Sequence, residues 1–117
     1  MNTENMILVE VHKVAACDDR AFYVPVELFI YHSQIPMSSS VYAHVACYGR
    51  DAVFSGDGHA EGHGYDKYHA AACDALLAAG VTLPDRYPCG TLTELIEGVA
   101  RELGFYNLKT HVLTERN

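Results

Sequence analysis

The residues with the clearest chemical potential lie in one short segment, residues 55–69. It contains four glycines and three histidines. Closely spaced glycines let backbone amides approach a ligand with no side chain in the way, and imidazoles titrate near neutral pH. Backbone freedom and titratable groups therefore coincide here, and we expect the working site in this segment.

The same segment predicts an anion site, because it leads from a predicted strand into a predicted helix. A helix N-terminus offers unpaired amides and the positive end of the helix dipole to phosphate, carboxylate or a nucleotide. Lys67 lies in the first turn, where a cation opposes the dipole by roughly 0.3–1 kcal/mol, and a bound anion would relieve that cost. The spacing matches neither the P-loop nor the dinucleotide-binding fingerprint. The predicted ligand-binding residues are Gly58, Gly62, Gly64, Tyr65, Asp66 and Lys67.

A simpler interpretation needs no ligand. Lys67 then points to solvent or pairs with Asp66 or Glu61, and the glycines form an irregular turn. Charged side chains at a helix start are commonly solvated, so both interpretations stay open.

Metal binding is an alternative for this segment, with His59 and His63 as the main ligands, His69 and Asp57 as further candidates and zinc as the metal. Imidazoles four residues apart share a face only on a helix, and the intervening glycines disfavour a helix. The metalloprotease pattern His-Glu-x-x-His is absent from the sequence. We therefore expect no cofactor, with zinc as the alternative.

General acid–base catalysis is the third hypothesis, with His63 and His69 as the catalytic pair beside a bound phosphodiester. His69 also falls on the apolar stripe of a predicted helix, which favours a hydrogen-bonded core histidine. His44, with Tyr42 and Tyr48 as strand neighbours, is a secondary candidate. Those tyrosines could stack on a base, although packing on a sheet is their more frequent use.

The elements that must position these residues follow from periodicity. Alternating or β-rich patterns predict strands over residues 6–14, 21–32, 41–48 and 105–113, with residues 52–54 as a short fourth strand or a continuation of the third. Pro25 marks an edge, a bulge or a break in the second strand. Residues 56–64 are expected to form a glycine-rich loop.

Two helices follow the glycines. The first is predicted over residues 66–79, with Asp66 as its N-cap and Gly80 closing it. The second begins at the capping box formed by Thr91 and Glu94 and ends at Gly104. The order β-β-β-(β)-α-α-β predicts a single α+β domain spanning residues 1–117. Its sheet is mostly antiparallel, has four or five strands and is covered on one face by the two helices.

Composition limits the compartment and the partners. The chain has 117 residues, fifteen acidic and eight basic side chains, and a formal net charge of −7. The scattered cations do not favour direct binding to duplex nucleic acid. The N-terminus lacks a basic leader, and the apolar run over residues 6–9 is too short for a membrane span, so we expect a cytoplasmic protein with no membrane partner.

The four cysteines are Cys17, Cys47, Cys73 and Cys89. They include no C-x-x-C pair, which predicts reduced thiols in or near the core. A nucleophilic role for Cys73 or Cys89 beside a histidine is the alternative.

The decapeptide Gly-His-Ala-Glu-Gly-His-Gly-Tyr-Asp-Lys, residues 58–67, precedes an alanine-rich helical segment. It resembles the G-x-A-x-G-x-G-Y-D-K pattern of small proteins from phages, prophages and other mobile elements. The histidines at positions 59 and 63 are not fixed in that pattern, and this chain has His69 where a serine often follows the lysine. The resemblance implies an accessory protein of the anti-defence kind, acting in the host cytoplasm, with a host defence protein as a candidate partner.

These observations favour a protein that binds a phosphorylated small molecule, with a nucleotide signal as the expected ligand and sequestration ahead of hydrolysis. A homo-oligomer is expected, because small domains often build a pocket between subunits. One alternative is a phosphodiesterase or metal-dependent hydrolase that uses the loop histidines. Another is an acidic protein-interaction module that inhibits a host nuclease complex.

Overall fold

A computed structural model describes residues 6–17, 22–34, 40–49, 51–61, 67–81 and 91–114. It confirms the α+β class, with five strands and two helices in the order β-β-β-β-α-α-β. The strands are β1 Met6–Cys17, β2 Phe22–Ser33, β3 Val41–Tyr48, β4 Val53–Ala60 and β5 Leu108–Thr114, and the helices are α1 Lys67–Ala78 and α2 Leu92–Glu102. Neither described helix is long and apolar enough to cross a membrane.

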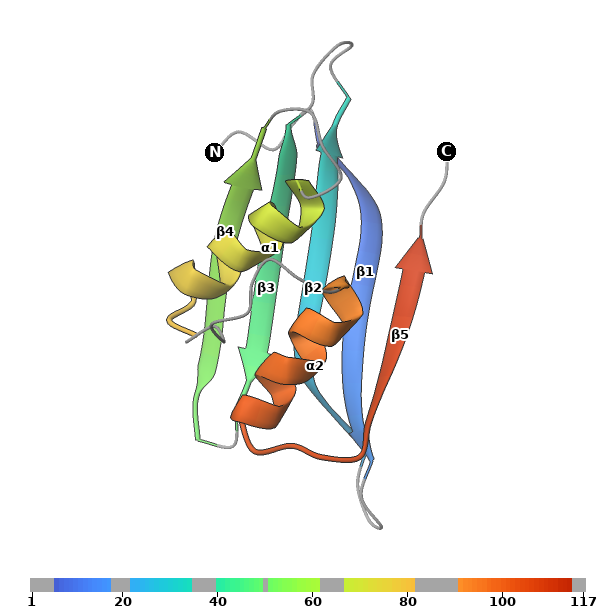
Figure 1. The fold of residues 1–117 in the computed structure, drawn as a ribbon, viewed down its shortest axis with the longest axis vertical. Coiled ribbons are helices and arrows are strands. Elements are labelled where there is room, and N and C mark those ends of the chain that lie inside the picture. Colours follow the sequence, from blue (N-terminus) through green and yellow to red (C-terminus); the bar gives the residue numbers. More distant parts are fainter. Residues whose placement is uncertain are drawn as a thin grey trace.

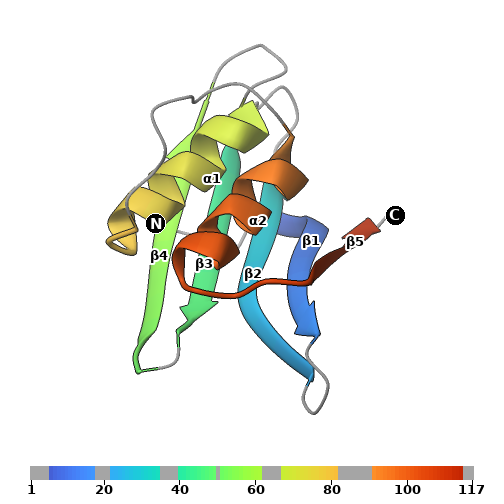
Figure 2. The ribbon, with the colours of Figure 1, turned by 60° about the horizontal axis from the view of Figure 1, so that its bottom comes forward.

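The five strands form one antiparallel sheet in the spatial order β4-β3-β2-β1-β5. Both helices lie on the same face, with α1 packed against β4 and β3 and α2 packed against β2 and β1 (Figures 1 and 2). After α2 the chain passes below the sheet and returns as β5 beside β1. The opposite face of the sheet is not covered by either helix.

Side chains along the central strands point alternately to the core and to the uncovered face of the sheet. In β3, Val41, Ala43, Val45 and Cys47 are fully buried beneath the helices. Tyr42 and His44, which lie between them, belong to the uncovered face, as the period of two along a strand requires. The helices complete the core with Leu76 from α1 and with Leu95, Ile96 and Val99 from α2.

Pro25 lies inside the sheet at a β-bulge, one of its three predicted settings. Val14 pairs with Val26 and Ala16 pairs with Tyr23, so Val24 and Pro25 lie opposite Ala15 alone. A bulge leaves one residue outside the ladder, and proline has no N–H to lose there.

The second helix has the predicted N-terminus. The Thr91 hydroxyl accepts a hydrogen bond from the backbone N–H of Glu94 at 3.1 Å. This bond satisfies one of the amides left unpaired by the first turn. Gly104 follows the C-cap Leu103 and has φ of +92°, a conformation that glycine adopts without a Cβ penalty.

The first strand was expected to end at Val14, but β1 continues to Cys17. Two further predicted boundaries were wrong. The glycine-rich loop was expected to begin at Gly56, but strand β4 continues to Ala60. The last strand was expected from Phe105, but β5 begins at Leu108. Phe105 is instead buried, with its ring stacked on Tyr23 at a centroid distance of 5.2 Å. In both places packing against a distant element overrides the local pattern.

Candidate functional site

Two of the glycines serve the contact between β4 and α1. A Cβ on Gly58 would lie 2.1 Å from the carbonyl oxygen of Ala71 and 2.4 Å from the amide nitrogen of Ala75. A Cβ on Gly56 would lie 2.3 Å from the carbonyl oxygen of Ala75. The helix backbone therefore approaches the strand as closely as it does because neither position carries a side chain. This packing explains both glycines without a ligand.

The second half of the predicted loop lies outside the described residues. Gly62, His63, Gly64, Tyr65 and Asp66 all fall there. Their proposed roles as ligand-binding, catalytic or metal-binding residues therefore stay predictions.

Lys67 is the first residue of α1, and its Nζ lies 3.5 Å from Nε2 of His32, near the end of β2. The other ring nitrogen of His32, Nδ1, lies 3.0 Å from the carbonyl oxygen of Ser33. With the Nδ1 proton donated to that carbonyl, Nε2 is the lone-pair nitrogen that faces the ammonium. Lys67 forms no ion pair with any carboxylate of the described residues. Glu61, one of its two expected partners, instead accepts from the Ser40 hydroxyl at 3.1 Å.

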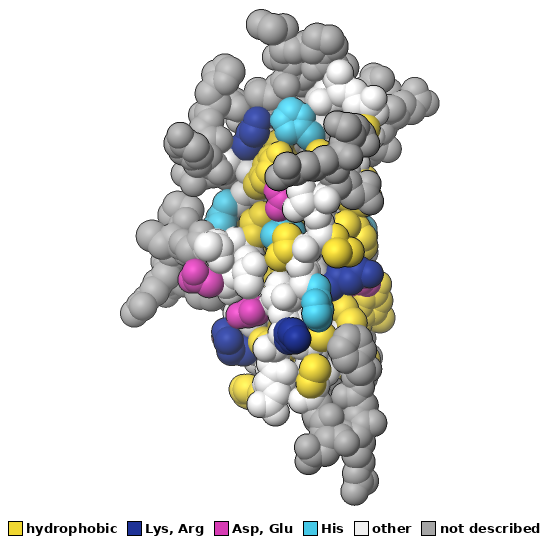
Figure 3. Space-filling model, turned by 90° about the vertical axis from the view of Figure 1, so that its right-hand side faces the viewer, with side chains coloured by type: hydrophobic (Ala, Val, Ile, Leu, Met, Phe, Trp, Pro, Cys, Tyr) yellow, Lys and Arg dark blue, Asp and Glu magenta, His cyan; other side chains and the backbone are white. Residues whose placement is uncertain are grey.

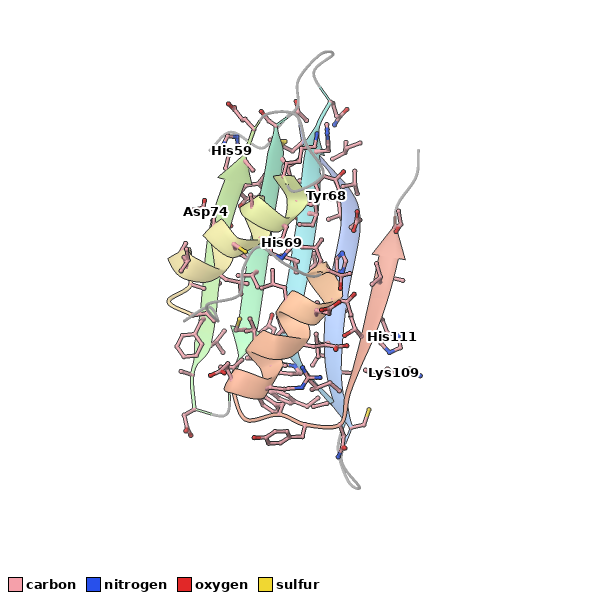
Figure 4. All side chains as sticks on the ribbon, viewed as in Figure 1. His59, Tyr68, His69, Asp74, Lys109 and His111 are labelled. Atoms are coloured by element: carbon pink, nitrogen blue, oxygen red, sulfur yellow. The ribbon has the colours of Figure 1, made fainter. Side chains whose placement is uncertain are left out.

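His59, predicted as a metal ligand, lies on the uncovered face of β4. Its Nε2 is 3.5 Å from Oε1 of Glu61, and its backbone N–H donates to Asp74 of α1 at 3.2 Å. Figure 4 shows His59 and Asp74 together at the outer edge of the sheet. Among the described residues, no group of three His, Cys, Asp or Glu side chains is placed to hold a metal ion.

His69, predicted as catalytic, is a core residue with 7% exposure. Its Nδ1 lies 3.5 Å from Sγ of Cys73, one helical turn later, and Figure 4 shows its side chain in the interior. Burial raises the pKa of the Cys73 thiol, which disfavours the thiolate that a nucleophile needs. This is the placement expected of a core histidine. The described cysteines, Cys17, Cys47 and Cys73, are free thiols. Cys47 is buried and Cys73 is half-buried, as predicted, but Cys17 is exposed at the end of β1, so its expected place in or near the core was wrong.

The structure adds a cluster on the uncovered face that the sequence did not assemble. Asp57 Oδ1 accepts from the Tyr42 hydroxyl at 2.5 Å and lies 2.7 Å from Nδ1 of His44. Strand pairing places these residues together, because His44 lies directly opposite Asp57 across β3 and β4. His44 was a secondary candidate, and the partners that orient its ring depend on a register that periodicity alone does not give.

The hydrogen bonds shift the titration of this cluster. Those from Tyr42 and His44 lower the pKa of Asp57, so the carboxylate is charged at neutral pH. Burial, followed by the bond to Asp57, raises the pKa of Tyr42 to about 12. The Asp57 carboxylate holds Nδ1 of His44 and leaves Nε2 for a substrate or ligand, which is the orientation that a general base requires.

The lowered pKa of Asp57 predicts a pH dependence. A carboxyl whose folded-state pKa is depressed contributes stability above its unfolded pKa of about 3.9, and this is lost as the pH falls through the folded value. Asp57 is 58% exposed, so the contribution should stay below about 1 kcal/mol. Carbon-13 NMR should show the Asp57 carboxyl titrating below the ordinary pKa of an aspartate in the wild type and at a higher pH in Tyr42→Phe. An identical titration in both proteins would contradict the assignment.

A hollow of about 280 Å³ adjoins the cluster at the edge of β4 and is lined by Tyr42, Asp57, Gly58, His59 and Asp74. Its two carboxylates repel a phosphate group. A phosphate is therefore better placed at Lys67 and His32, on the helix side of the sheet, than in this hollow.

No protein-family model, curated protein or solved structure matches this chain.

Proposed function

We propose that the protein binds a phosphorylated small molecule at the start of α1, with the Lys67 ammonium as the group that contacts the phosphate and His32 as the residue that positions it. The observation that carries the proposal is the position of the Lys67 ammonium, which lies against an imidazole and not against a described carboxylate. A phosphate can accept hydrogen bonds from the ammonium and from the first amides of the helix. The charge of Lys67 is therefore not neutralised by a described carboxylate and can pair with a bound anion.

The ligand class follows from the resemblance. Gly62, Gly64, Tyr65 and Asp66 would complete the site from the segment just before α1. In the anti-defence role that the resemblance implies, the ligand is a nucleotide signal and the protein sequesters it. The expected homo-oligomer belongs to the same proposal.

Lys67→Ala should weaken ligand binding at least about tenfold, because a charge-assisted hydrogen bond contributes roughly 1.5–3 kcal/mol. The melting temperature of the unliganded protein should change little. Isothermal titration calorimetry with cyclic dinucleotides, ADP-ribose and inorganic phosphate measures the affinity. Lys109→Ala is the matched control, since Lys109 is an exposed lysine on the opposite edge strand. Equal affinities in wild type and Lys67→Ala would overturn the proposal.

Hydrolysis is the second candidate, favoured by the His44–Asp57 pair with its contact of 2.7 Å. The protein is incubated with each nucleotide, denatured, and the released ligand is weighed by mass spectrometry. An intact ligand supports sequestration, whereas a product that His44→Ala no longer forms supports hydrolysis. Native mass spectrometry of the same sample reports bound metal and subunit number.

A further inference from the structure

The second half of the edge strand β5, from His111 to Thr114, is exposed on both faces of the sheet among the described residues. Val112 and Leu113 are adjacent, so their side chains point to opposite faces of the sheet, yet they are 47% and 57% exposed. Figures 1 and 2 show β5 at the edge of the sheet, to one side of α2. On its helix side, the Thr110 hydroxyl donates to Glu97 of α2 at 2.8 Å. An exposed apolar edge strand is a template for pairing with another strand.

The opposite edge of the sheet is protected along the second half of β4, which α1 covers, whereas Val53 and Phe54 at the start of that strand are exposed. Helix α1 packs directly on β4, and the Asp74 carboxylate accepts the backbone N–H of His59. A side chain that satisfies an edge amide removes a donor from any incoming strand. The two edges of one sheet therefore differ in their capacity for strand addition.

The backbone groups that β5 offers can be assigned from its register with β1. Cys17 N donates to the carbonyl oxygen of Asn107 at 3.2 Å, and the pairing continues without a shift from Ala16–Leu108 to Glu10–Thr114. Antiparallel strands alternate between hydrogen-bonded and non-hydrogen-bonded pairs. Alternate residues of β5, from Asn107 to Leu113, therefore bond to β1. The outward N–H and C=O groups belong to Leu108, Thr110, Val112 and Thr114.

The charge of β5 differs from that of the whole chain. The protein carries a formal net charge of −7, but the sequence of β5 contains Lys109 and His111 and no acidic residue. Lys13, opposite His111 on β1, is already paired with Glu27 at 3.4 Å. Figure 4 shows Lys109 and His111 projecting from the strand, and Figure 3, which looks onto this edge, shows hydrophobic, basic and histidine side chains together, with acidic side chains beside them.

We propose that β5 is a docking site for an extended acidic peptide segment of a partner protein, which adds as a sixth, antiparallel strand. The peptide would pair with the outward groups of Thr110 and Val112, place carboxylates opposite Lys109 and His111, and place apolar side chains opposite Val112 and Leu113. A second copy of β5 fits less well in the register that centres both strands on Thr110, because that register places Lys109 of each chain opposite His111 of the other. Two carboxylates lie close to β5: Glu97, which contacts Thr110 and pairs with Arg101, and Glu10, which lies opposite Thr114 and contacts His12. Negative charges beyond roughly 8 Å are screened at physiological salt.

The test uses the full chain and a fluorescein-labelled peptide with glutamates opposite Lys109 and His111 and valines at the other paired positions. Fluorescence anisotropy should show binding. N-methylation of the two peptide residues opposite Thr110 and Val112 removes donors that face β5 and should weaken binding about tenfold or more. N-methylation of the residues opposite Lys109 and His111, whose amides face away, is the matched control and should have a much smaller effect.

Charge variants test the recognition separately. Lys109→Glu should weaken peptide binding about fivefold. Arg50→Glu makes the same change in net charge in the segment between β3 and β4, two strands that do not pair with β5, and should leave binding unchanged. Equal losses from both N-methylation patterns, equal effects of both charge variants, or no binding of the peptide would overturn the proposal. Dimerisation through β5, detected by light scattering and abolished by Thr110→Pro, would also overturn it.

Discussion

Gly58→Ala should lower the free energy of unfolding by about 3 kcal/mol, because the new methyl group has no space. It would lie 2.1 Å from Ala71 O and 2.4 Å from Ala75 N. Both atoms belong to the helix backbone, which cannot rotate away as a flexible side chain can. The helix must move off β4 and give up part of the contact that closes this side of the core. Urea denaturation followed by circular dichroism measures the loss.

Gly98→Ala is the matched control for that experiment. Gly98 lies inside α2, and a Cβ built there meets nothing within 4 Å. Alanine is favoured over glycine in a helix interior, so this variant should gain roughly 0.5–1 kcal/mol. If Gly58→Ala lowers the free energy of unfolding and Gly98→Ala raises it, close packing against α1 is the reason that position 58 requires glycine. A Gly58→Ala protein as stable as wild type would refute the close approach of α1 to β4.

Leu76→Ala should also cost about 3 kcal/mol, within the range for deleting a fully buried leucine side chain. Leu76 is fully buried in the core cluster under α1. The loss combines the transfer of apolar surface with a cavity that the neighbouring strands fill only partly. The same denaturation measurement applies, and the urea m-value should stay constant if only the folded state is affected.

Leu77 provides the control, because it follows Leu76 on the same helix and is 60% exposed. Leu77→Ala should change the free energy of unfolding by less than about 0.5 kcal/mol. Similar losses from the two variants would mean that α1 presents a different face to the sheet.

The experiments on Gly58 and Lys67 separate structure from function within the decapeptide of residues 58–67. Gly58 lies against the backbone of α1, so its substitution should act on stability. Lys67 lies beside His32 at the helix start, so its substitution should act on ligand affinity. A variant that loses affinity at full stability supports the phosphate site, and one that loses only stability supports a purely structural motif.

Local patterns were sufficient for most of the fold. Alternation in β3 separates buried Val45 from half-buried His44, and the Thr91 cap locates the start of α2. These signals are local, because a side chain's direction in a strand and a cap's hydrogen bonds depend on near neighbours in the sequence. Glycines in a strand are the exception. Gly56 and Gly58 weaken a strand locally, and only contact with α1 makes that composition favourable.

The candidate site also has features that the sequence determined and features that only the tertiary structure decided. The sequence by itself determined that the segment before α1 combines glycines, histidines and Lys67, and that an antiparallel sheet lies under two helices. Only the tertiary structure decided which residues meet. His32 and Lys67 are 35 positions apart, and Asp57 meets Tyr42 and His44 through the register of β3 and β4. The order of the strands in the sheet also places β5 at an edge, where its second half is exposed. Pairings between distant segments depend on the packing of the whole sheet, so no local pattern specifies them.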